Sequence, residues 1–324
     1  MEDILVTGAT GTVGSAIARR LLARGRPVKA LVRDVERGRS LLPEGVTLVQ
    51  GDVTDFTSVR SAMKGVGTVY HAAGLPEQWR PDPADFWNVN VTGTRHIVKA
   101  ATAAGVQTFV YTSTIDVFRW TRGKQFDESA LDDSPKHTPY ERSKQIADRI
   151  VTQAIEQGLP ARLLHPSAVY GPAPVITPGT NHLLNELRHN RIPLLIPGGL
   201  PVVLADDVAD GHIAAETSPV GSRFILSESY QSLTDVAHTV RRHSVTARVP
   251  RVLPRWIARV GAVAGEATAR LTHRPPLIPS GQLHFLASHA LPLADRAATE
   301  LGWRPTPFDA GVEQTLAAFE DTAE

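Results

Sequence analysis

The segment YERSK places a phenol, Tyr140, and an ammonium group, Lys144, four residues apart. On a helix, positions i and i+4 lie on one face, so we expect these side chains to be neighbours. A neighbouring cation favours the phenolate, which should lower the pKa of Tyr140 from its usual value of about 10. Such a tyrosine can exchange a proton with an oxygen at neutral pH, as a carbonyl group requires when its carbon accepts a hydride.

A second group of residues, near the start of the chain, has the spacing of a phosphate-binding loop. The sequence TGATGTVG contains Gly8, Gly11 and Gly14, follows the apolar run 4–6 and opens a helical pattern over 13–23. Glycines at such positions permit a tight turn and let backbone N–H groups approach a pyrophosphate at the positive end of a helix. The Gly-Lys-Ser/Thr ending of a P-loop is missing. We therefore predict a dinucleotide site, with a glycine-rich turn that binds no ligand as the alternative.

The residues after the second apolar run bear on the choice of cofactor. This run ends at Val32 and is followed by Arg33 and Asp34. An acidic residue at this point of a dinucleotide fold holds a ribose 2′-hydroxyl, whereas an arginine pairs with a 2′-phosphate. Arg33 therefore favours NADP, and Asp34 keeps NAD as the alternative. Both side chains could instead be solvated surface charges.

The apolar pattern between these residues is typical of an alternating α/β fold. Runs that suit buried parallel strands fall at 4–6, 28–32, 46–49, 68–70 and 108–111, and helical patterns fall at 13–23, 92–104 and 142–157. Such alternation predicts right-handed crossovers and a doubly wound parallel sheet. After about residue 164 prolines cluster and the alternation is lost, although 202–204 and 224–226 look like strands that return to the sheet or lie beside it.

The composition limits the classes of partner and compartment. The 324 residues include 34 basic and 33 acidic side chains, a net charge of +1, which argues against a nucleic-acid partner. The absence of cysteine excludes disulfides and thiolate metal sites and permits a reducing compartment. The twelve histidines show no ligand spacing, so we expect no metal. Because no apolar stretch is long enough to span a membrane and a strand pattern begins within four residues of the N-terminus, we expect a cytoplasmic protein without a signal peptide.

Further motifs, taken in order along the chain, match one enzyme family. They are TGATGTVG at 7–14, Gly51-Asp52-Val53, His71-Ala72-Ala73-Gly74, Asn88-Val89-Asn90-Val91-Thr92-Gly93-Thr94, Tyr111-Thr112-Ser113-Thr114, Tyr140 with Lys144, and the segment from His165-Pro166 to Tyr170-Gly171-Pro172. With these motifs the chain resembles the extended short-chain dehydrogenases/reductases of the NAD-dependent epimerase/dehydratase superfamily, most strongly over 1–172. The resemblance implies a Rossmann dinucleotide-binding domain at 1–164, to which 201–226 return, and a smaller C-terminal substrate-binding region at 165–200 and 227–324.

The resemblance also implies roles for individual residues. Tyr140 would donate a proton to the substrate oxygen, Lys144 would hold the nicotinamide ribose and lower the pKa of Tyr140, and Thr114, with Ser113 as the neighbouring candidate, would hydrogen-bond the substrate oxygen. The cofactor would be bound by Gly8, Thr10, Gly11, Thr12, Val13, Gly14, Arg33, Asp52, Val53, Ala72, Ala73, Gly74, Thr112, Tyr140, Lys144 and Pro166. Family members are often dimers through two helices of the sheet domain, so a homodimer is an expectation.

Within this family the chain is most similar to the 3β-hydroxysteroid dehydrogenase and dihydroflavonol reductase branches. The likeness is carried by YTSTIDVF at 111–118, TPYERSK at 138–144, and a tail with Arg274-Pro275-Pro276 and Leu301-Gly302-Trp303-Arg304-Pro305. The chain departs from the family pattern at Phe118, where many members have tyrosine, and at Arg119, where many have glycine. His165 replaces the asparagine that is usual in nucleotide-sugar epimerases, which counts against a sugar-nucleotide substrate.

These features together predict an NADP-dependent oxidoreductase that reduces a ketone, or oxidises the secondary alcohol, of a bulky apolar small molecule. One alternative is an epimerase or dehydratase that retains NAD. Another is a catalytically silent NADP-binding sensor, against which the intact Tyr140 and Lys144 argue. Aromatic residues in connections that could cover the cofactor suggest a large apolar pocket, namely Trp79, Phe86, Trp87, Phe118 and Trp120.

The remaining features have ordinary structural explanations. Asp206 and Asp207 precede an apolar helical stretch, so we expect them to act as helix N-caps. His165 is predicted to be a packed residue near the site. The loop 119–137 is predicted to be a lid or a solvated excursion. The pattern over 256–271 predicts an amphipathic helix packed on the protein rather than one that lies on a membrane surface.

Overall fold

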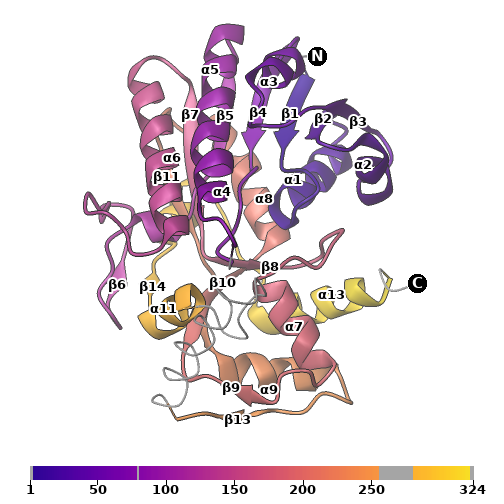
Figure 1. The fold of residues 1–324 in the computed structure, drawn as a ribbon, viewed down its shortest axis with the longest axis vertical. Coiled ribbons are helices and arrows are strands. Elements are labelled where there is room, and N and C mark those ends of the chain that lie inside the picture. The colour runs from indigo at the N-terminus through magenta and orange to yellow at the C-terminus, as the bar shows by residue number, and fades with distance from the viewer. Residues whose placement is uncertain (1–2, 79, 255–279, 322–324) are drawn as a thin grey trace.

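Residues 3–78, 80–254 and 280–321 are described by a computed structural model, which is organised around one large parallel sheet (Figure 1). Its seven strands have the order β11-β7-β5-β4-β1-β2-β3, and every neighbouring pair is parallel. The strands are β1 (Asp3–Thr7), β2 (Val28–Val32), β3 (Val46–Gln50), β4 (Val66–His71), β5 (Thr108–Thr112), β7 (Ala161–Pro166) and β11 (Arg223–Leu226). Because the strand order reverses between β1 and β4, the predicted doubly wound α/β fold is confirmed.

Helices cover both faces of this sheet. The covering helices are α1 (Thr12–Ala23) and α8 (Ala205–Ala214) on one face, and α3 (Phe56–Ala62), α5 (Thr94–Ala104) and α6 (Pro139–Glu156) on the other. Strand β1 shows why both faces need cover: Ile4 and Val6 point into one apolar core, and Leu5 between them points into the other. The apolar runs of the sequence are continuous rather than alternating for this reason.

The helix that carries Tyr140 and Lys144 begins three residues before the predicted start at Arg142. The side chain of Thr138 accepts a hydrogen bond from the backbone N–H of Glu141 (3.1 Å), and the Glu141 carboxylate accepts one from the N–H of Thr138 (2.8 Å). This reciprocal capping box, with a proline in the first helical position, begins α6 at residue 139. Tyr140 consequently lies in the first turn of the helix, and Lys144 lies in the next turn.

The segment predicted as a helix over 92–104 begins within a π-helical stretch and becomes α-helical only at Thr94. A short helix α4 (Ala84–Phe86) and a π-helical stretch (Trp87–Gly93) lead into α5, which begins at Thr94. The helix ends at Gly105, whose φ of +65° is favoured by glycine. A second helix close to the site, α2 (Val35–Leu41), follows β2 directly.

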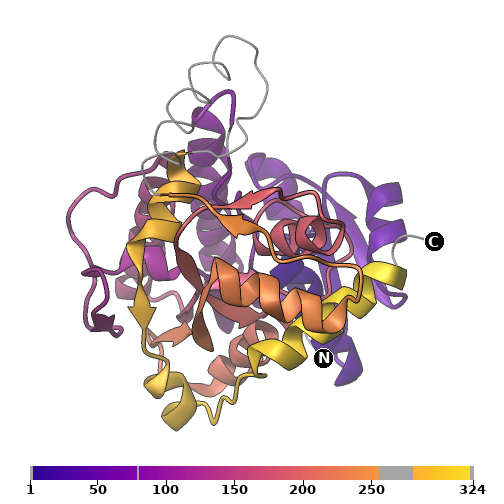
Figure 2. The ribbon, with the colours of Figure 1, turned by 90° about the horizontal axis from the view of Figure 1, so that it is seen from below.

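A smaller group of elements lies at the lower end of the sheet in Figure 1. Its three-stranded sheet has the order β12-β10-β8, with β8 (Ala168–Tyr170), β10 (Gly199–Leu204) and β12 (Ser229–Ser232). Helices α7 (Thr180–Arg188), α9 (Leu233–His243) and α13 (Phe308–Asp321) share a separate apolar core with it. Two further pairs are β9 (Leu194–Leu195) with β13 (Arg251–Val252), and β6 (Gln125–Phe126) with β14 (Leu291–Pro292). Seen from below, these elements and the helix α11 (Ser280–Ser288) lie in front of the large sheet (Figure 2). The helix α12 (Asp295–Glu300) packs against β11 and shares a core with the large sheet.

Two strands were expected to return to the sheet or lie beside it. The segment 224–226 joins the large sheet as part of β11, next to β7, whereas 202–204 belongs to β10 and pairs with β8 and β12. The helix predicted over 256–271 and the motif Arg274–Pro276 lie outside the described residues. The loop 119–137 is mostly exposed, but it is anchored at Phe126, which is buried against Phe118, and through β6, which pairs with β14.

The prediction that Asp206 and Asp207 cap a helix is wrong in its position. Leu204 is the N-cap of α8, and both carboxylates lie in the first helical turn, where they still face the positive end of the helix. Asp206 forms an ion pair with Arg19 of α1 (2.7 Å). The Asp207 carboxylate accepts hydrogen bonds from the N–H (2.6 Å) and the hydroxyl (3.0 Å) of Thr306. The two aspartates therefore hold α8 to its neighbours in place of capping it.

Candidate active site

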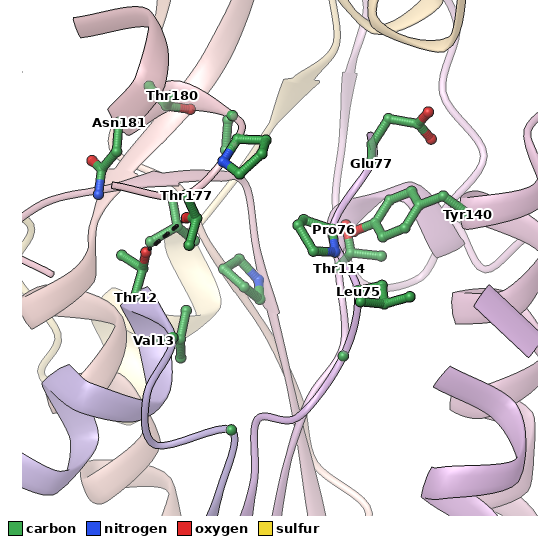
Figure 3. Close-up of a pocket in the computed structure, with 18 of the residues that line it drawn as sticks. Thr12, Val13, Leu75, Pro76, Glu77, Thr114, Tyr140, Thr177, Thr180 and Asn181 are labelled. Carbon is green, nitrogen blue, oxygen red and sulfur yellow. Dashed lines mark hydrogen bonds between the residues drawn. The ribbon is translucent and has the colours of Figure 1, made fainter. Parts of the chain in front are cut away.

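The carboxyl ends of the large sheet's strands open into a cavity of about 1240 Å³. Its wall combines the loops after β1, β2, β4 and β5 with the start of α6 and with segments of the smaller group of elements (Figure 3). Open parallel sheets bind ligands at this edge. All the residues predicted to bind the cofactor line this single cavity, as do Ser113 and Thr114.

The glycine loop is wound as tightly as its sequence suggested. Gly8 has a φ of +70°, and a Cβ on this residue would lie 2.7 Å from the backbone nitrogen of Ala73. The N–H of Gly11 donates to the carbonyl oxygen of Gly8 (2.9 Å), and a Cβ on Gly14 would collide with that same carbonyl group. Gly11 is also the N-cap of α1, with no side-chain hydrogen bond at the cap. The backbone at the start of α1 is therefore exposed to the cavity, as a pyrophosphate site requires.

The end of β2 presents two arginines to the cavity. Arg33 and Arg37 both line it and both are exposed. Asp34 also lines it, but its carboxylate accepts a hydrogen bond from the backbone N–H of Arg37 (3.0 Å) and caps α2. Within the described ranges, the guanidinium group of Arg33 has no hydrogen bond or ion pair. The N-cap role of Asp34 was not predicted, although an aspartate before a helical pattern is a local indication of one.

The tyrosine and threonine that were predicted to be catalytic meet at the cavity wall. Thr114 follows β5, Tyr140 lies at the start of α6, and both line the cavity. Figure 3 shows these two side chains on one side of the cavity, opposite Thr12 and Thr177. The ring of Phe86 packs edge-on against the ring of Tyr140, with 6.1 Å between ring centres.

The ammonium group of Lys144 is bonded to β5, and the pKa of Tyr140 is not shifted in the predicted direction. Its ammonium group donates to the carbonyl oxygen of Thr112 (2.8 Å) and to the hydroxyl of Tyr111 (3.2 Å). Burial, followed by the nearby Asp116 and Glu77, raises the pKa of Tyr140 well above its ordinary value, although the nearby hydroxyl of Thr114 lowers it. The pKa of Tyr140 is therefore raised, whereas the sequence predicted that it is lowered. Helical spacing places both residues on one face, but it does not determine which way a long side chain bends.

Two carboxyl groups beside Tyr140 were not anticipated from the sequence. The carboxylate of Asp116 accepts a hydrogen bond from the hydroxyl of Thr114 (2.7 Å), and that of Glu77 accepts one from the hydroxyl of Thr138 (3.0 Å). Both residues line the cavity. Burial is the main cause that raises the pKa of each to about 7. The negative charge of Glu141 adds to it for Asp116, and the charges of Asp116 and Glu141 add to it for Glu77. The only indication in the sequence was the position of Asp116, two residues after the predicted Thr114.

The apolar part of the wall differs from the predicted aromatic cover. Of the four predicted aromatic residues that the structure describes, Trp120 lines the cavity, whereas Phe86 and Phe118 are buried in the protein and Trp87 is 38% exposed. Trp79 lies outside the described residues. The apolar lining comes instead from aliphatic residues and one phenylalanine, namely Val175, Leu183, Ile192, Leu194, Leu195, Ile196, Leu200, Leu253, Phe285 and Leu286.

A buried ionic network supports the strand that precedes Thr114. The carboxylate of Asp148 accepts hydrogen bonds from the hydroxyl of Ser113 (2.6 Å) and from Arg223 (2.8 Å), and it lies 3.0 Å from the Nε2 atom of His165. The ring of His165 is fully buried against Phe118, so its prediction as a packed residue is confirmed. This network was not apparent from the sequence, because its members are separated by up to 110 positions between Ser113 and Arg223.

The described part of the chain has neither a membrane-spanning helix nor a metal-binding cluster. None of its helices combines the length and the apolar composition that a membrane span needs. Among these residues, no group of three or more histidine or acidic side chains is arranged to hold a metal ion.

Comparison with known proteins agrees with the resemblance seen in the sequence. The model of the NAD dependent epimerase/dehydratase family matches residues 4–224. Sterol demethylase protein B of Methylococcus capsulatus is 26% identical over 98% of each chain, and a putative dihydroflavonol 4-reductase of Synechocystis is 29% identical over 93% of this chain and 90% of that protein. The crystal structure of gox2253 has a TM-score of 0.84 and 31% identity, and covers 99% of this chain and 98% of its own. From the family match and the shared Rossmann-like fold, we conclude that the chain belongs to the NAD dependent epimerase/dehydratase family, whose members bind a nicotinamide dinucleotide.

Proposed function

We propose that the protein is an NADP-dependent oxidoreductase that reduces a ketone, or oxidises the corresponding secondary alcohol, of a bulky apolar small molecule. One observation carries the proposal. Tyr140 and Thr114 line the same cavity as the glycine loop at one end and a set of aliphatic side chains at the other. A proton donor, a dinucleotide loop and an apolar binding surface are thus within one enclosure.

The cofactor end of the cavity fits a dinucleotide with a 2′-phosphate. The N–H groups at the start of α1 would bind the pyrophosphate, and Arg33 with Arg37 would bind the phosphate on the adenosine ribose. The carboxylate of Asp34, which could otherwise bind the 2′-hydroxyl of the adenosine ribose, accepts the N-cap hydrogen bond of α2. When bound, NADPH supplies the hydride. Lys144, which is buried and whose pKa is lowered by burial to about 8, remains mostly protonated at neutral pH and would hold the nicotinamide ribose.

The reacting end of the cavity has the groups that a carbonyl reduction needs. Tyr140 is a neutral phenol at neutral pH, because its pKa is raised, so it can donate a proton to the oxygen of the substrate. Thr114 would hydrogen-bond the same oxygen and orient the phenol. Ser113, the neighbouring candidate, donates its hydroxyl to Asp148 and is therefore engaged elsewhere.

The aliphatic lining supports an apolar substrate. Most of these side chains belong to 175–200 and 253–286, which supports the predicted division into a sheet domain and a substrate-binding region at 165–200 and 227–324. Two relatives are named for sterol demethylation and dihydroflavonol reduction, which favours a carbon skeleton over a sugar nucleotide. His165 is buried and stands where nucleotide-sugar epimerases usually have asparagine, which also counts against a sugar-nucleotide substrate. The homodimer and the cytoplasmic location stay predictions.

The test is the oxidation of NADPH in the presence of a panel of ketones that ranges from small aliphatic to steroid-sized molecules. We expect continuous turnover that requires added NADPH and that improves with the apolar size of the ketone. NAD that co-purifies tightly with the protein, together with no net consumption of NADPH, would instead support the epimerase or dehydratase alternative. Tight NADPH binding without any turnover would support the alternative of a catalytically silent NADP-binding sensor.

A further inference from the structure

A loop of the smaller group of elements reaches the helix that follows the glycine loop. The loop 171–179 connects β8 to α7, and the hydroxyl of its Thr177 is hydrogen-bonded to the hydroxyl of Thr12, the first residue of α1 (3.5 Å). The two residues are 165 positions apart in the sequence, and both line the cavity. Figure 3 shows this hydrogen bond on the side of the cavity opposite Tyr140 and Thr114. Thr177 therefore lies at the cofactor end of the cavity and away from the reacting groups.

The loop 171–179 is anchored to the elements around it. The buried side chain of Asn181, at the start of α7, accepts a hydrogen bond from the N–H of Gly171 (2.9 Å) and donates one to the carbonyl oxygen of the same residue (2.9 Å). Arg19 of α1 donates to the carbonyl oxygen of Pro172 (3.4 Å). The loop is thus closed upon itself and joined to the helix on which Thr12 lies. These bonds hold Thr177 beside the start of α1.

The two hydroxyl groups suit a phosphate ligand. Their oxygen–oxygen distance of 3.5 Å exceeds the roughly 2.5–3.0 Å of a typical O–H···O bond, so the bond between them is weak. Each hydroxyl has one proton to donate, and the bond between Thr12 and Thr177 uses only one of the two. A phosphate oxygen is ionised and accepts stronger hydrogen bonds than a neutral hydroxyl does. Both threonines gain when they donate to a phosphate rather than to each other.

The backbone beside Thr12 provides further donors for the same group. Gly11, the N-cap of α1, makes no side-chain hydrogen bond at the cap. The first N–H groups of a helix have no partner within the helix, and its positive end favours an anion. Thr177 would therefore add a donor from the smaller group of elements to those that the sheet domain offers. The sequence did not indicate this residue, because the motifs of the cofactor site lie in the sheet domain.

We infer, on the basis of the dinucleotide binding in the proposed function, that Thr177 is a cofactor-binding residue whose hydroxyl, together with that of Thr12, donates to the pyrophosphate of the dinucleotide. The loop 171–179 then contacts the cofactor from the substrate-binding region, while the glycine loop contacts it from the sheet domain. The contact involves the pyrophosphate alone, so it serves NADP and NAD alike. Arg33, in contrast, is proposed to act on the 2′-phosphate.

The experiment compares the unmodified protein with Thr177→Val, Thr177→Ser and, as a control, Thr299→Val. Valine keeps the shape of threonine without the hydroxyl, and serine keeps the hydroxyl. Thr299 is exposed, bonds only to the backbone of its own helix among the described residues, and does not line the cavity. Titration calorimetry would measure the dissociation constants of NADP⁺, NAD⁺ and adenosine 2′-monophosphate, which has no pyrophosphate, on protein freed of co-purified nucleotide. Thermal unfolding would verify that each variant is folded.

The inference predicts a loss that follows the pyrophosphate. Thr177→Val should weaken the binding of NADP⁺ and of NAD⁺ by a similar factor of about ten or more, since a hydrogen bond to a charged group is lost. The affinity for adenosine 2′-monophosphate should change by less than about twofold. Thr177→Ser should restore most of the affinity for both dinucleotides, and Thr299→Val should bind all three ligands as the unmodified protein does.

Two results would overturn the role of Thr177 while the proposed function stands. One is a Thr177→Val variant that binds both dinucleotides as tightly as the unmodified protein. The other is an equal loss in Thr177→Val and Thr177→Ser, which would assign the effect to the packing of the loop. Because no ketone is present, a protein that reduces no ketone still tests Thr177. An unmodified protein that binds neither dinucleotide would contradict the inference and the proposed function together.

Discussion

The ammonium group of Lys144 lies 2.8 Å from the carbonyl oxygen of Thr112, the last residue of β5. This hydrogen bond ties the second turn of α6 to the carboxyl edge of the sheet. Lys144 is buried, so the bond is charge-assisted and shielded from water. The lysine therefore fixes the position of the helix that presents Tyr140, while the proton chemistry of the phenol depends on Thr114 and the nearby carboxyl groups.

Replacement of the phenolic hydroxyl tests the proton donor. Tyr140→Phe should reduce kcat for ketone reduction by at least about 100-fold, since general acid catalysis contributes on that scale. The NADPH dissociation constant, measured by fluorescence, should change by no more than about threefold, because the proposed cofactor contacts remain. Tyr230→Phe, a change outside the cavity lining, is the matched control and should keep full turnover. Near-normal activity of Tyr140→Phe would discredit the assignment.

A substitution of Lys144 separates cofactor binding from tyrosine acidification. Lys144→Met should weaken NADPH binding by about tenfold or more, because a charged hydrogen-bond donor to the ribose is lost. The pH dependence of kcat should keep its midpoint, since burial and Asp116 set the pKa of Tyr140. Unchanged NADPH affinity together with a shifted pH profile would restore the acidifying role of Lys144 that the sequence predicted.

Cofactor choice should depend on Arg33. Arg33→Ala should weaken NADPH binding by about 10- to 100-fold and leave NADH binding unaltered, because only NADPH carries the 2′-phosphate. Arg39→Ala is the control: this exposed arginine pairs with Glu36 in the same helix and does not line the cavity. Equal catalytic efficiency of the unmodified protein with NADPH and NADH would refute the assignment of NADP.

The glycine loop can be tested with two glycines that share a backbone conformation. Gly8 has a φ of +70° and Gly25 a φ of +68°, but a Cβ on Gly8 would meet the backbone of Ala73, whereas one on Gly25 meets nothing within 4 Å. Gly25→Ala should lower the free energy of unfolding by about 1–2 kcal/mol, the cost of a left-handed conformation alone. Gly8→Ala should cost more and should also weaken NADPH binding. Similar effects of the two substitutions in denaturant titrations would argue against the close approach at Gly8.

The buried carboxylate of Asp148 should make stability depend on pH. Burial opposes ionisation, but His165, Arg223 and Ser113 together hold the pKa of Asp148 well below its ordinary value. Its stabilising contribution is therefore complete above the unfolded pKa of about 4 and is lost as the pH falls below it. Asp148→Asn should cost about 3–5 kcal/mol at pH 7, because it leaves buried charge unpaired, and the difference should shrink toward pH 2.

An exposed ion pair provides the control for this measurement. Asp309 pairs with Arg242 at the surface, where both side chains are more than half exposed to solvent (51% and 57%). Asp309→Asn should change the free energy of unfolding by less than about 1 kcal/mol. If Asp148→Asn were equally mild at pH 7, the network beneath Ser113 and Thr114 would not stabilise the fold as inferred.

Much of the fold was determined by the sequence itself, because the signals are local. Continuous apolar runs predicted β1 to β5 within about two residues, since strands buried on both faces need no polar alternation. Gly8, Gly11 and Gly14 predicted the tight loop because only glycine allows that backbone approach. The cofactor-binding and catalytic residues that the family resemblance implied likewise all line one cavity.

The chemistry around Tyr140 was decided only by the tertiary structure. Packing between segments distant in sequence determines which way Lys144 bends and brings Asp116 and Glu77 close to the phenol. It also brings Leu195 and Leu286 together in the lining of one cavity. A helical or strand pattern specifies which face a side chain occupies. The partner that it meets there, and hence the pKa of the group, follows from burial and from charges that only the folded chain brings together.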